Sequence, residues 1–297
     1  MNSWRGSTKT QYCVYLNMWL KFLEHKAPTT SQGLKFLDYL FRQGASYSKL
    51  SIARSAISLL IDTGNSDSFG KQAIVKRYMK GVFELNPVFP RYNLTWNITN
   101  LFNYFRNMPH QRTLPFSLLG KKLALLIALL AGGQRCQTIH AINVLHIKVL
   151  SDRCIIPIYQ TLKHTRVGTH LHPLEFRVYL SEEKLCVVDN LKWYLHKTMV
   201  LRTHPELFIG TIKPHSPVTR DTISRWCRSL MKQAGIDITK YTTHSSRSAA
   251  SSFAKEKGVP LKNIIGACGW SRESTFVRFY DKQIDRSEVT IAEDLLD

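Results

Sequence analysis

The sequence predicts a mainly α-helical protein with a small antiparallel β-sheet, arranged as two domains. Apolar residues recur at intervals of three and four over most of the 297 residues, which is typical of amphipathic helices. Two prolines and the loss of this period in residues 86–93 indicate an extended connector. Runs of β-like composition lie between residues 145 and 179, where they predict the sheet.

Residues 1–85 are expected to form a helical domain with a basic surface. The predicted helices run from about Tyr12 to Leu23, Ser31 to Gly44, Ser48 to Thr63 and Lys71 to Lys80. Pro28 and Gly64 follow the first and third helices as stop signals. In the third helix Leu59 and Leu60 are expected to face the core.

Residues 94–297 are expected to form the second domain, of mixed α/β structure. Helices are predicted at Ile98–Met108 and at Leu118–Ala131, and the second is apolar enough to be buried before it stops at Gly132-Gly133. The predicted strands are Leu145–Leu150, Cys154–Gln160 and Leu171–Tyr179. Further helices are expected at Val187–Leu201, Thr219–Ala234, Ser245–Lys257 and Leu261–Ala267, and in a segment reaching Tyr280.

The charge of the chain points to a polyanionic partner. Lysine and arginine number 41 against 21 aspartates and glutamates, a formal net charge of +20. No acidic residue occurs between Glu84 and Asp152, whereas seven basic residues do. Such a field attracts nucleic acid by counterion release, although a basic protein can also be merely soluble.

Several other classes are disfavoured. The longest apolar run, Leu123–Ala131, is about half as long as a membrane-spanning helix, so we expect no membrane partner. The N-terminus lacks a signal-like apolar stretch, which favours an intracellular protein. The six cysteines are widely spaced without a C-x-x-C pair, which argues against a zinc ribbon or a disulfide framework. The sequence also lacks a P-loop motif and a convincing carboxylate cluster, so we expect no metal and no other cofactor.

Four positions are candidates for binding a phosphate. Arg135 follows the Gly-Gly stop of the buried helix, and Lys163 precedes a turn-prone His-Thr-Arg-Val-Gly stretch. His244 and Arg247 are spaced three apart at the start of a predicted helix, so they share a face beside free backbone N–H groups. Helix capping, surface ion pairing or a solvated hairpin lysine would explain each of these residues taken alone.

An aromatic segment follows near the C-terminus, where Trp270 precedes Tyr280. With it, the order Arg, Lys, His-x-x-Arg, Trp, Tyr resembles the tyrosine recombinase (phage-integrase-like) family. The stretches Gly-Gln-Arg-Cys-Gln-Thr-Ile-His at 133–140 and Gly-Trp-Ser-Arg-Glu-Ser-Thr-Phe at 269–276 are most similar to recombinases of DIRS/Ngaro-type retroelements. The resemblance implies a helical core-binding (SAM-like) domain at 1–85, a linker at 86–93 and a catalytic domain at 94–297.

The sequence departs from the family pattern at three points. Thr138 stands where many members have an acidic residue, and Trp270 stands where most have histidine. The spacing from Trp270 to Tyr280 is one residue longer than expected. Position 279 is phenylalanine, which leaves Tyr280 as the candidate nucleophile.

The resemblance implies DNA strand transfer, and the chemistry of the residues fits this reaction. Arg135 and Arg247 can donate bidentate hydrogen bonds to the nonbridging oxygens of a scissile phosphate. The phenol of Tyr280, a group with an ordinary pKa of about 10, would pass its proton to the imidazole of His244 as it attacks. Lys163 would protonate the departing 5′ oxygen, and Trp270 would donate its indole N–H to the phosphate. The product is a 3′-phosphotyrosyl intermediate that forms without ATP or metal.

Double-stranded DNA is the expected partner, held between the two basic domains. The expected contacts to the DNA backbone come from Lys49, Arg54, Lys76, Arg77, Arg166, Arg220 and Arg225. The acidic, amphipathic tail after Tyr280 resembles the family segment that docks on a neighbouring protomer, which would build a homotetramer on DNA. Docking of this tail back onto its own domain is the alternative.

The leading interpretation is therefore a site-specific recombinase or integrase that integrates a mobile element, located in the nucleus if the host is eukaryotic. A type IB topoisomerase, which uses the same chemistry to relax one duplex, is a second interpretation. A catalytically silent DNA-binding protein derived from a recombinase is the third, and Thr138 is its best support.

Overall fold

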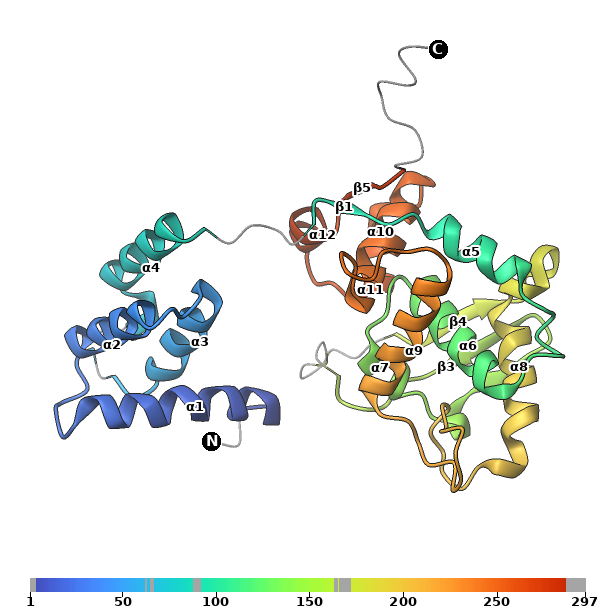
Figure 1. Ribbon diagram of the computed structural model, residues 1–297, viewed down its shortest axis with the longest axis horizontal. Coiled ribbons are helices and arrows are strands. Elements are labelled where there is room, and N and C mark those ends of the chain that lie inside the picture. The colour runs from blue at the N-terminus through green and yellow to red at the C-terminus, as the bar shows by residue number, and fades with distance from the viewer. Residues whose placement is uncertain are drawn as a thin grey trace, which may run out of the picture. The chain divides into compact units, whose positions relative to one another are not determined.

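A computed structural model of the chain divides into two compact units, Met1–Pro90 and Arg91–Asp297 (Figure 1). The structure describes residues 4–61, 63–64, 67–87, 92–162, 165 and 172–286. Each unit is described by itself. Across the described ranges, no helix has the length and apolar character needed to cross a membrane.

The secondary structure of the first unit is helical throughout its described residues. It comprises α1 (Gly6–Leu23), α2 (Thr30–Arg42), α3 (Tyr47–Ile57), the 3-10 helix η1 (Phe69–Lys71) and α4 (Ala73–Leu85). The side chains of Thr29 and Ser46 cap α2 and α3 by accepting hydrogen bonds from backbone N–H groups of their first turns. The core is built from large apolar side chains, among them Trp19, Phe36 and Phe69, all fully buried.

One expectation for this unit is wrong. Helix α3 ends at Ile57 rather than at Thr63, so Leu59 and Leu60 lie beyond it. They are 54% and 43% exposed instead of facing the core. The hydroxyl of Ser58 donates to the carbonyl of Arg54 and accepts from the N–H of Gly70, so it ties the end of α3 to η1.

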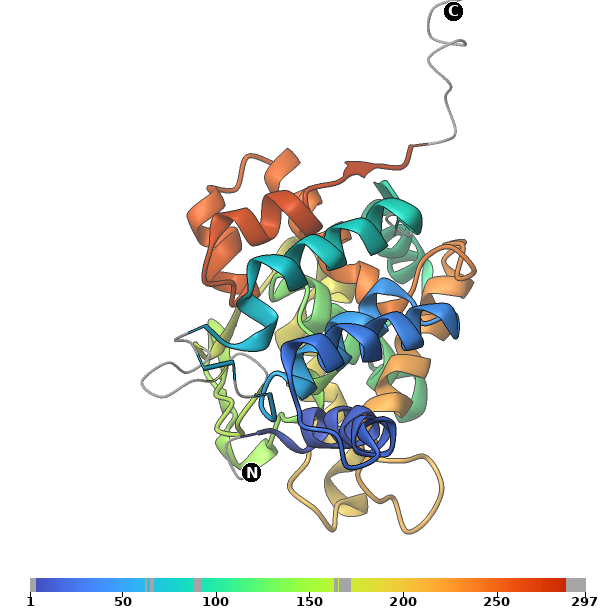
Figure 2. The same cartoon turned by 90° about the vertical axis from the view of Figure 1, so that its left-hand side faces the viewer.

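The second unit is built around one buried helix. Its α-helices are α5 (Ile98–Asn107), α6 (Phe116–Leu130), α7 (Cys136–His140), α8 (Val187–Thr198), α9 (Arg220–Gln233), α10 (Ser246–Glu256), α11 (Leu261–Cys268) and α12 (Glu273–Phe279). Its 3-10 helices are η2 (Val144–His146), η3 (Leu180–Leu185), η4 (Met199–Leu201) and η5 (Thr243–Ser245). Helix α6 packs against α8 and α9, and Leu123–Leu129 are buried along it. Helices α10, α11 and α12 gather at one corner of the unit (Figures 1 and 2).

The predicted antiparallel sheet is present with shorter strands than expected. Strands β2 (Lys148–Val149), β3 (Arg153–Ile156) and β4 (Leu174–Arg177) pair in the order β2-β3-β4. The mainly helical class with a small antiparallel sheet is thereby confirmed. A second, parallel pair, β1 (Leu94–Thr95) with β5 (Gln283–Ile284), was not predicted. Strands of two residues are too short to carry an alternating pattern.

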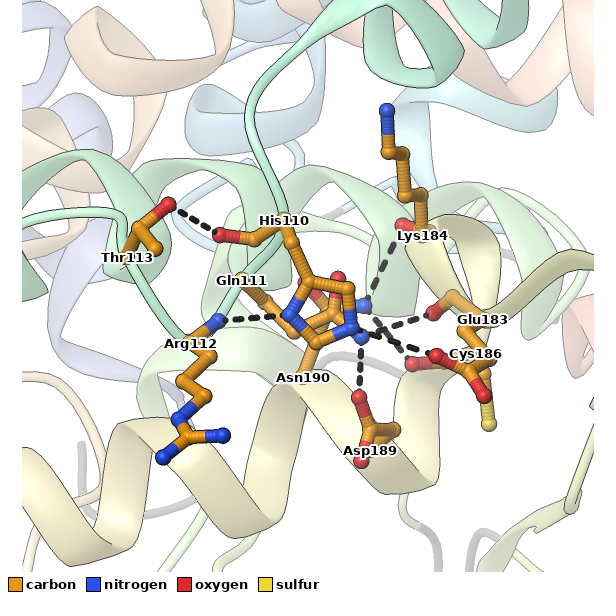
Figure 3. Close-up of polar contacts among 9 residues, drawn as sticks. All are labelled: His110, Gln111, Arg112, Thr113, Glu183, Lys184, Cys186, Asp189 and Asn190. Carbon is orange, nitrogen blue, oxygen red and sulfur yellow. Dashed lines mark hydrogen bonds and ion pairs between the residues drawn. The ribbon is translucent and has the colours of Figure 1, made fainter.

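A buried polar cluster fixes the loop between α5 and α6 (Figure 3). The side-chain amide of Gln111 donates to the carbonyl oxygen of Glu183, at 3.1 Å, and to the Asp189 carboxylate. The amide of Asn190 donates to the carbonyl oxygens of Lys184 and Cys186. The Gln111 bonds hold the loop before α6 against η3 and the first turn of α8, and the Asn190 bonds hold η3 against α8.

Candidate active site

Arg135 is placed by the turn that ends α6. Gly132 and Gly133 have φ values of +80° and +75°, which an L side chain rarely adopts. A Cβ at Gly133 would lie 2.6 Å from Cα of Arg247, so only glycine allows this close approach. Gln134 anchors the turn by donating its amide to the carbonyls of Ala131 and Ala267. Arg135 is therefore held beside α10 and α11.

Arg247 lies on the first turn of α10 and is only 1% exposed. Its Nη1 donates to the Gly133 carbonyl at 2.7 Å, and its Nη2 donates to the Cys268 carbonyl at 2.9 Å. Its Cζ lies 5.0 Å from the Trp270 ring centroid and 5.5 Å from that of Tyr280, within cation–π range. Burial and, secondarily, the positive charge of Arg135 lower the pKa of the Arg247 guanidinium.

His244 and Tyr280 face each other across the site. His244 lies in η5 directly before α10, and its Nε2 is 3.5 Å from Tyr280 Oη. Tyr280 follows the last residue of α12 and stacks on Trp270 with ring centroids 4.6 Å apart. The hydroxyl of Ser252 donates to the Tyr280 carbonyl at 2.8 Å, which fixes the backbone of this residue to α10.

A cavity of about 470 Å³ adjoins these side chains and is lined by Arg135, His244 and Arg247 together with part of α9. Three buried nitrogen donors have no hydrogen-bond partner among the described residues: Arg135 Nη1, Arg247 Nε and Trp270 Nε1. Buried N–H groups without partners are costly, so these donors are suited to an anion that supplies the missing acceptors. The described residues contain no group of three or more His, Cys, Asp or Glu that could hold a metal ion.

The structure thus brings together five of the six predicted catalytic residues, Arg135, His244, Arg247, Trp270 and Tyr280. Lys163 lies outside the described residues, as does Arg166 among the predicted DNA contacts. Lys49 and Arg54 lie on α3, Lys76 and Arg77 on α4, and Arg220 and Arg225 on α9. Arg220 also lines the cavity beside Arg135, so it belongs to the site itself.

Sequence reasoning missed the side chains that hold these groups in place. Trp96 donates its indole N–H to Ser245, and Ser252 binds the Tyr280 backbone. Serines within a helical segment and a tryptophan near a connector carry no local signal of such roles. The sequence indicated that Gly132 and Gly133 end a helix, but it did not indicate that Gly133 packs against Arg247.

The sequence matches the phage integrase family over residues 110–286, more than half of the chain, and the protein therefore belongs to this family of tyrosine recombinases. A search of curated protein sequences finds no match. Membership supports an enzyme that cleaves and rejoins DNA strands.

Solved structures of recombinases share the fold. A Tn1549 transposon integrase in complex with transposon right end DNA is 12% identical, with a TM-score of 0.62, and the match covers 99% of this chain and 93% of that chain. A XerH site-specific recombinase bound to palindromic difH substrate is 16% identical, with a TM-score of 0.59 and coverage of 91% and 75%. A lambda integrase dimer bound to a COC' core site is 14% identical, with a TM-score of 0.55 and coverage of 97% and 93%.

Proposed function

We propose that the protein is a site-specific DNA recombinase that cleaves and rejoins DNA through a 3′-phosphotyrosyl intermediate. The observation that carries the proposal is the convergence of two guanidiniums, an imidazole, an indole and a phenol, which come from η5, from α10 and from the segments adjoining α7, α11 and α12. Three buried N–H donors of this group have no hydrogen-bond partner among the described residues. A scissile phosphate supplies both the negative charge and the acceptor oxygens that this arrangement lacks.

The reaction begins when Tyr280 Oη attacks the phosphorus and its proton passes to Nε2 of His244, the nitrogen 3.5 Å away. Arg135 and Arg247 hold the nonbridging oxygens as negative charge develops, and Trp270 donates its indole N–H. The bond from phosphorus to the 5′ oxygen breaks, and Lys163 gives that oxygen its proton. A second 5′ hydroxyl then attacks the phosphotyrosyl bond and restores Tyr280.

The basic surfaces of both units would bind the DNA backbone. Lys49, Arg54, Lys76 and Arg77 would act from the first unit, and Arg166, Arg220 and Arg225 from the second. Recombinase structures of the same fold that are bound to DNA, one of them a dimer, support duplex DNA as the partner. Exchange of the acidic tail after Tyr280 between protomers would build a homotetramer on paired sites.

The biological role we propose is integration of a mobile element. The amino-acid sequences of residues 133–140 and 269–276 resemble those of DIRS/Ngaro-type recombinases, which supports this role. A eukaryotic element of this kind would require the protein to act in the nucleus.

A duplex with a nick near the cleavage position tests the proposed chemistry. Cleavage releases a short strand, which diffuses away and leaves the protein covalently attached to the DNA. We expect an adduct that is resistant to boiling in detergent, is absent from Tyr280→Phe, and forms unchanged in EDTA. DNA binding without any adduct would instead identify a silent DNA-binding protein.

Two further outcomes separate the remaining alternatives. Relaxation of a supercoiled plasmid without recombinants from a two-site plasmid would favour a topoisomerase. Loss of the adduct in EDTA would contradict a metal-free mechanism. Selection of bound duplexes from a random pool provides the target sequence for both assays.

A further inference from the structure

Strand β1 and the residue that follows it contact both the segment after Tyr280 and the turn that carries His244. Its residues Leu94 and Thr95 pair with Gln283 and Ile284 of β5, the strand that follows the nucleophile. The N–H of Asp285 extends this pairing by donating to the Thr95 carbonyl at 2.6 Å. The residue directly after β1, Trp96, donates a hydrogen bond to Ser245 of η5.

The bond between Trp96 and Ser245 is buried and joins residues 149 positions apart. The indole N–H donates to Ser245 Oγ at 2.9 Å, and this hydroxyl donates onward to the Thr242 carbonyl at 2.6 Å. Trp96 is 3% exposed and Ser245 is fully buried. The two bonds occupy the hydroxyl as both acceptor and donor, which fixes its orientation.

Ser245 is the neighbour of His244 in the single 3-10 turn η5, so its anchoring determines where the imidazole lies. On the other side of His244, Thr243 Oγ1 donates to the Ser224 carbonyl of α9 at 3.1 Å. The exposed imidazole is thus carried by a turn in which the residues on both sides of His244 form hydrogen bonds to other elements. Ser245 accepts from Trp96, the residue after β1, and Thr243 donates to α9.

The nucleophile side is tied to the same strand. Lys282 Nζ donates to the Tyr92 carbonyl at 2.5 Å and lies 4.0 Å from the centroid of the Tyr92 ring. The Tyr241 hydroxyl donates to the Asp285 carboxylate at 3.1 Å, which joins the segment before η5 to the segment after β5. Residues 92–96 therefore contact the chain on both sides of the 3.5 Å gap between His244 and Tyr280.

We propose that Trp96 is a positioning residue for proton transfer from Tyr280, acting through Ser245 to hold His244 within reach of the phenol. The inference rests on the proposed function. Because β1 also pairs with β5, the same segment of chain would fix the positions of both His244 and Tyr280. The N–H of Trp96 does not touch the reacting atoms and acts only through the turn that carries His244.

The substitution Trp96→Phe tests this role because it removes the indole N–H and keeps an aromatic ring in the core. A small displacement of a catalytic group can slow a reaction about 10²-fold. We expect single-turnover formation of the covalent adduct, measured on the nicked duplex at saturating DNA, to slow by about 10- to 100-fold. The dissociation constant for DNA should change by less than about twofold, because no predicted DNA contact is altered.

A double-mutant cycle provides the readout that a general packing defect would not move. If Trp96 acts through His244, Trp96→Phe combined with His244→Ala should be as slow as His244→Ala alone. If the double variant is instead slowed by the product of the two factors measured for Trp96→Phe and His244→Ala alone, the inference is overturned. Trp193→Phe, the same change at a half-buried tryptophan of α8, serves as the matched control and should cleave at the wild-type rate.

A second variant keeps the test decisive if Trp96→Phe fails to fold. Ser245→Ala removes the acceptor of the same bond and should show the same absence of additivity with His244→Ala. If the wild-type chain forms no Tyr280-dependent adduct, the proposed function fails and this inference falls with it. If the adduct forms but neither variant slows it, the inference alone fails.

Discussion

Arg247 is a charged side chain held almost without solvent contact, and its surroundings explain how the fold tolerates it. Two backbone carbonyls accept hydrogen bonds from its terminal nitrogens, and two aromatic rings lie within cation–π range. Its Nε has no partner among the described residues. A guanidinium whose N–H donors are not all bonded to the protein can donate the remaining hydrogen bond to a bound anion.

Gly133→Ala should disrupt this arrangement directly. The new Cβ would meet the Arg247 backbone at 2.6 Å, and alanine is strained at a φ of +75°. We expect a loss of more than about 1 kcal/mol in the free energy of unfolding, measured by urea titration, together with loss of DNA cleavage. Gly235→Ala is the control, since its φ is +79° but its Cβ would meet nothing within 4 Å. Equal effects of the two variants would contradict the account.

Lys122 provides a second prediction because its ammonium is fully buried in α6 without a hydrogen-bond partner in the described part of the chain. Burial, and secondarily the charge of Lys184, lowers its pKa from 10.5 to about 8. Between these values the unfolded chain binds a proton that the folded chain does not. The free energy of unfolding should therefore rise as pH increases above about 8.

Lys122→Met should remove this dependence and be more stable than the wild type at pH 7, where the buried charge is fully present. The measurement is urea unfolding of both proteins from pH 7 to 9.5, with Lys121→Met as the control on the neighbouring, half-buried residue. If the difference in unfolding free energy between Lys122→Met and the wild type does not vary with pH, Lys122 does not have a lowered pKa in the folded protein.

Individual residues of the site were predictable to different degrees. Arg135, His244, Arg247, Trp270 and Tyr280 stand in a recognisable order, and the structure gathers them. The anchoring bonds of Trp96 and Ser252 depend on contacts between residues far apart in sequence. No local pattern encodes such contacts, so the sequence could not predict them.

At the scale of elements, α10 is the helix that organises the site. Its first turn carries Arg247, and the preceding turn η5 carries His244. Further along, Ser252 donates to the Tyr280 carbonyl and accepts from the Lys282 N–H at 3.1 Å. Lys255 forms an ion pair with Asp281 at 2.6 Å, so α10 carries Arg247, continues directly from the turn that carries His244, and binds the segment that contains Tyr280.

Ser252→Ala should loosen the segment that contains Tyr280, because it removes the bonds of this hydroxyl to the backbone of Tyr280 and Lys282. We expect a loss of about 1 kcal/mol in the free energy of unfolding and slower adduct formation with unchanged DNA affinity. Ser251→Ala removes a neighbouring hydroxyl that bonds within α10, to the Arg247 carbonyl, and should leave the cleavage rate at the wild-type level. Equal rates for Ser252→Ala and the wild type would show that this bond does not position Tyr280.

Most elements were predictable because their patterns are local. The long helices α2, α6 and α9 follow from apolar periodicity and stop signals, with ends within a few residues of those predicted. Helix α7 has five residues and β1 and β5 have two each, too few for a period to register. The parallel pairing of β1 with β5 also joins distant parts of the chain.

For the whole molecule, the net charge of +20 makes binding to DNA a polyelectrolyte equilibrium. Exposed basic side chains of α4, such as Lys76 and Arg77, contribute positive charge from the first unit. The second unit adds Arg220 and Arg225 on the exposed face of α9. We expect the affinity for duplex DNA to fall steeply as salt increases.

Removal of one phosphate contact should lower the slope of log K against log salt by about 1. Lys76→Ala and Arg77→Ala should each show this change in fluorescence anisotropy titrations with duplex DNA. Arg42→Ala is the control, because Arg42 already forms an ion pair with Asp38 at 2.8 Å. Slopes that do not differ among the three variants would show that α4 does not contact the DNA backbone.

We have proposed that Tyr280 attacks a DNA phosphate at a site built by Arg135, His244 and Arg247. The most direct test of this proposal is to trap the protein on a nicked duplex, digest it with trypsin and nuclease, and locate the attached nucleotide by mass spectrometry. We expect the nucleotide on the peptide Phe279-Tyr280-Asp281-Lys282, linked through the phenol. A nucleotide attached to any other residue would contradict the proposal.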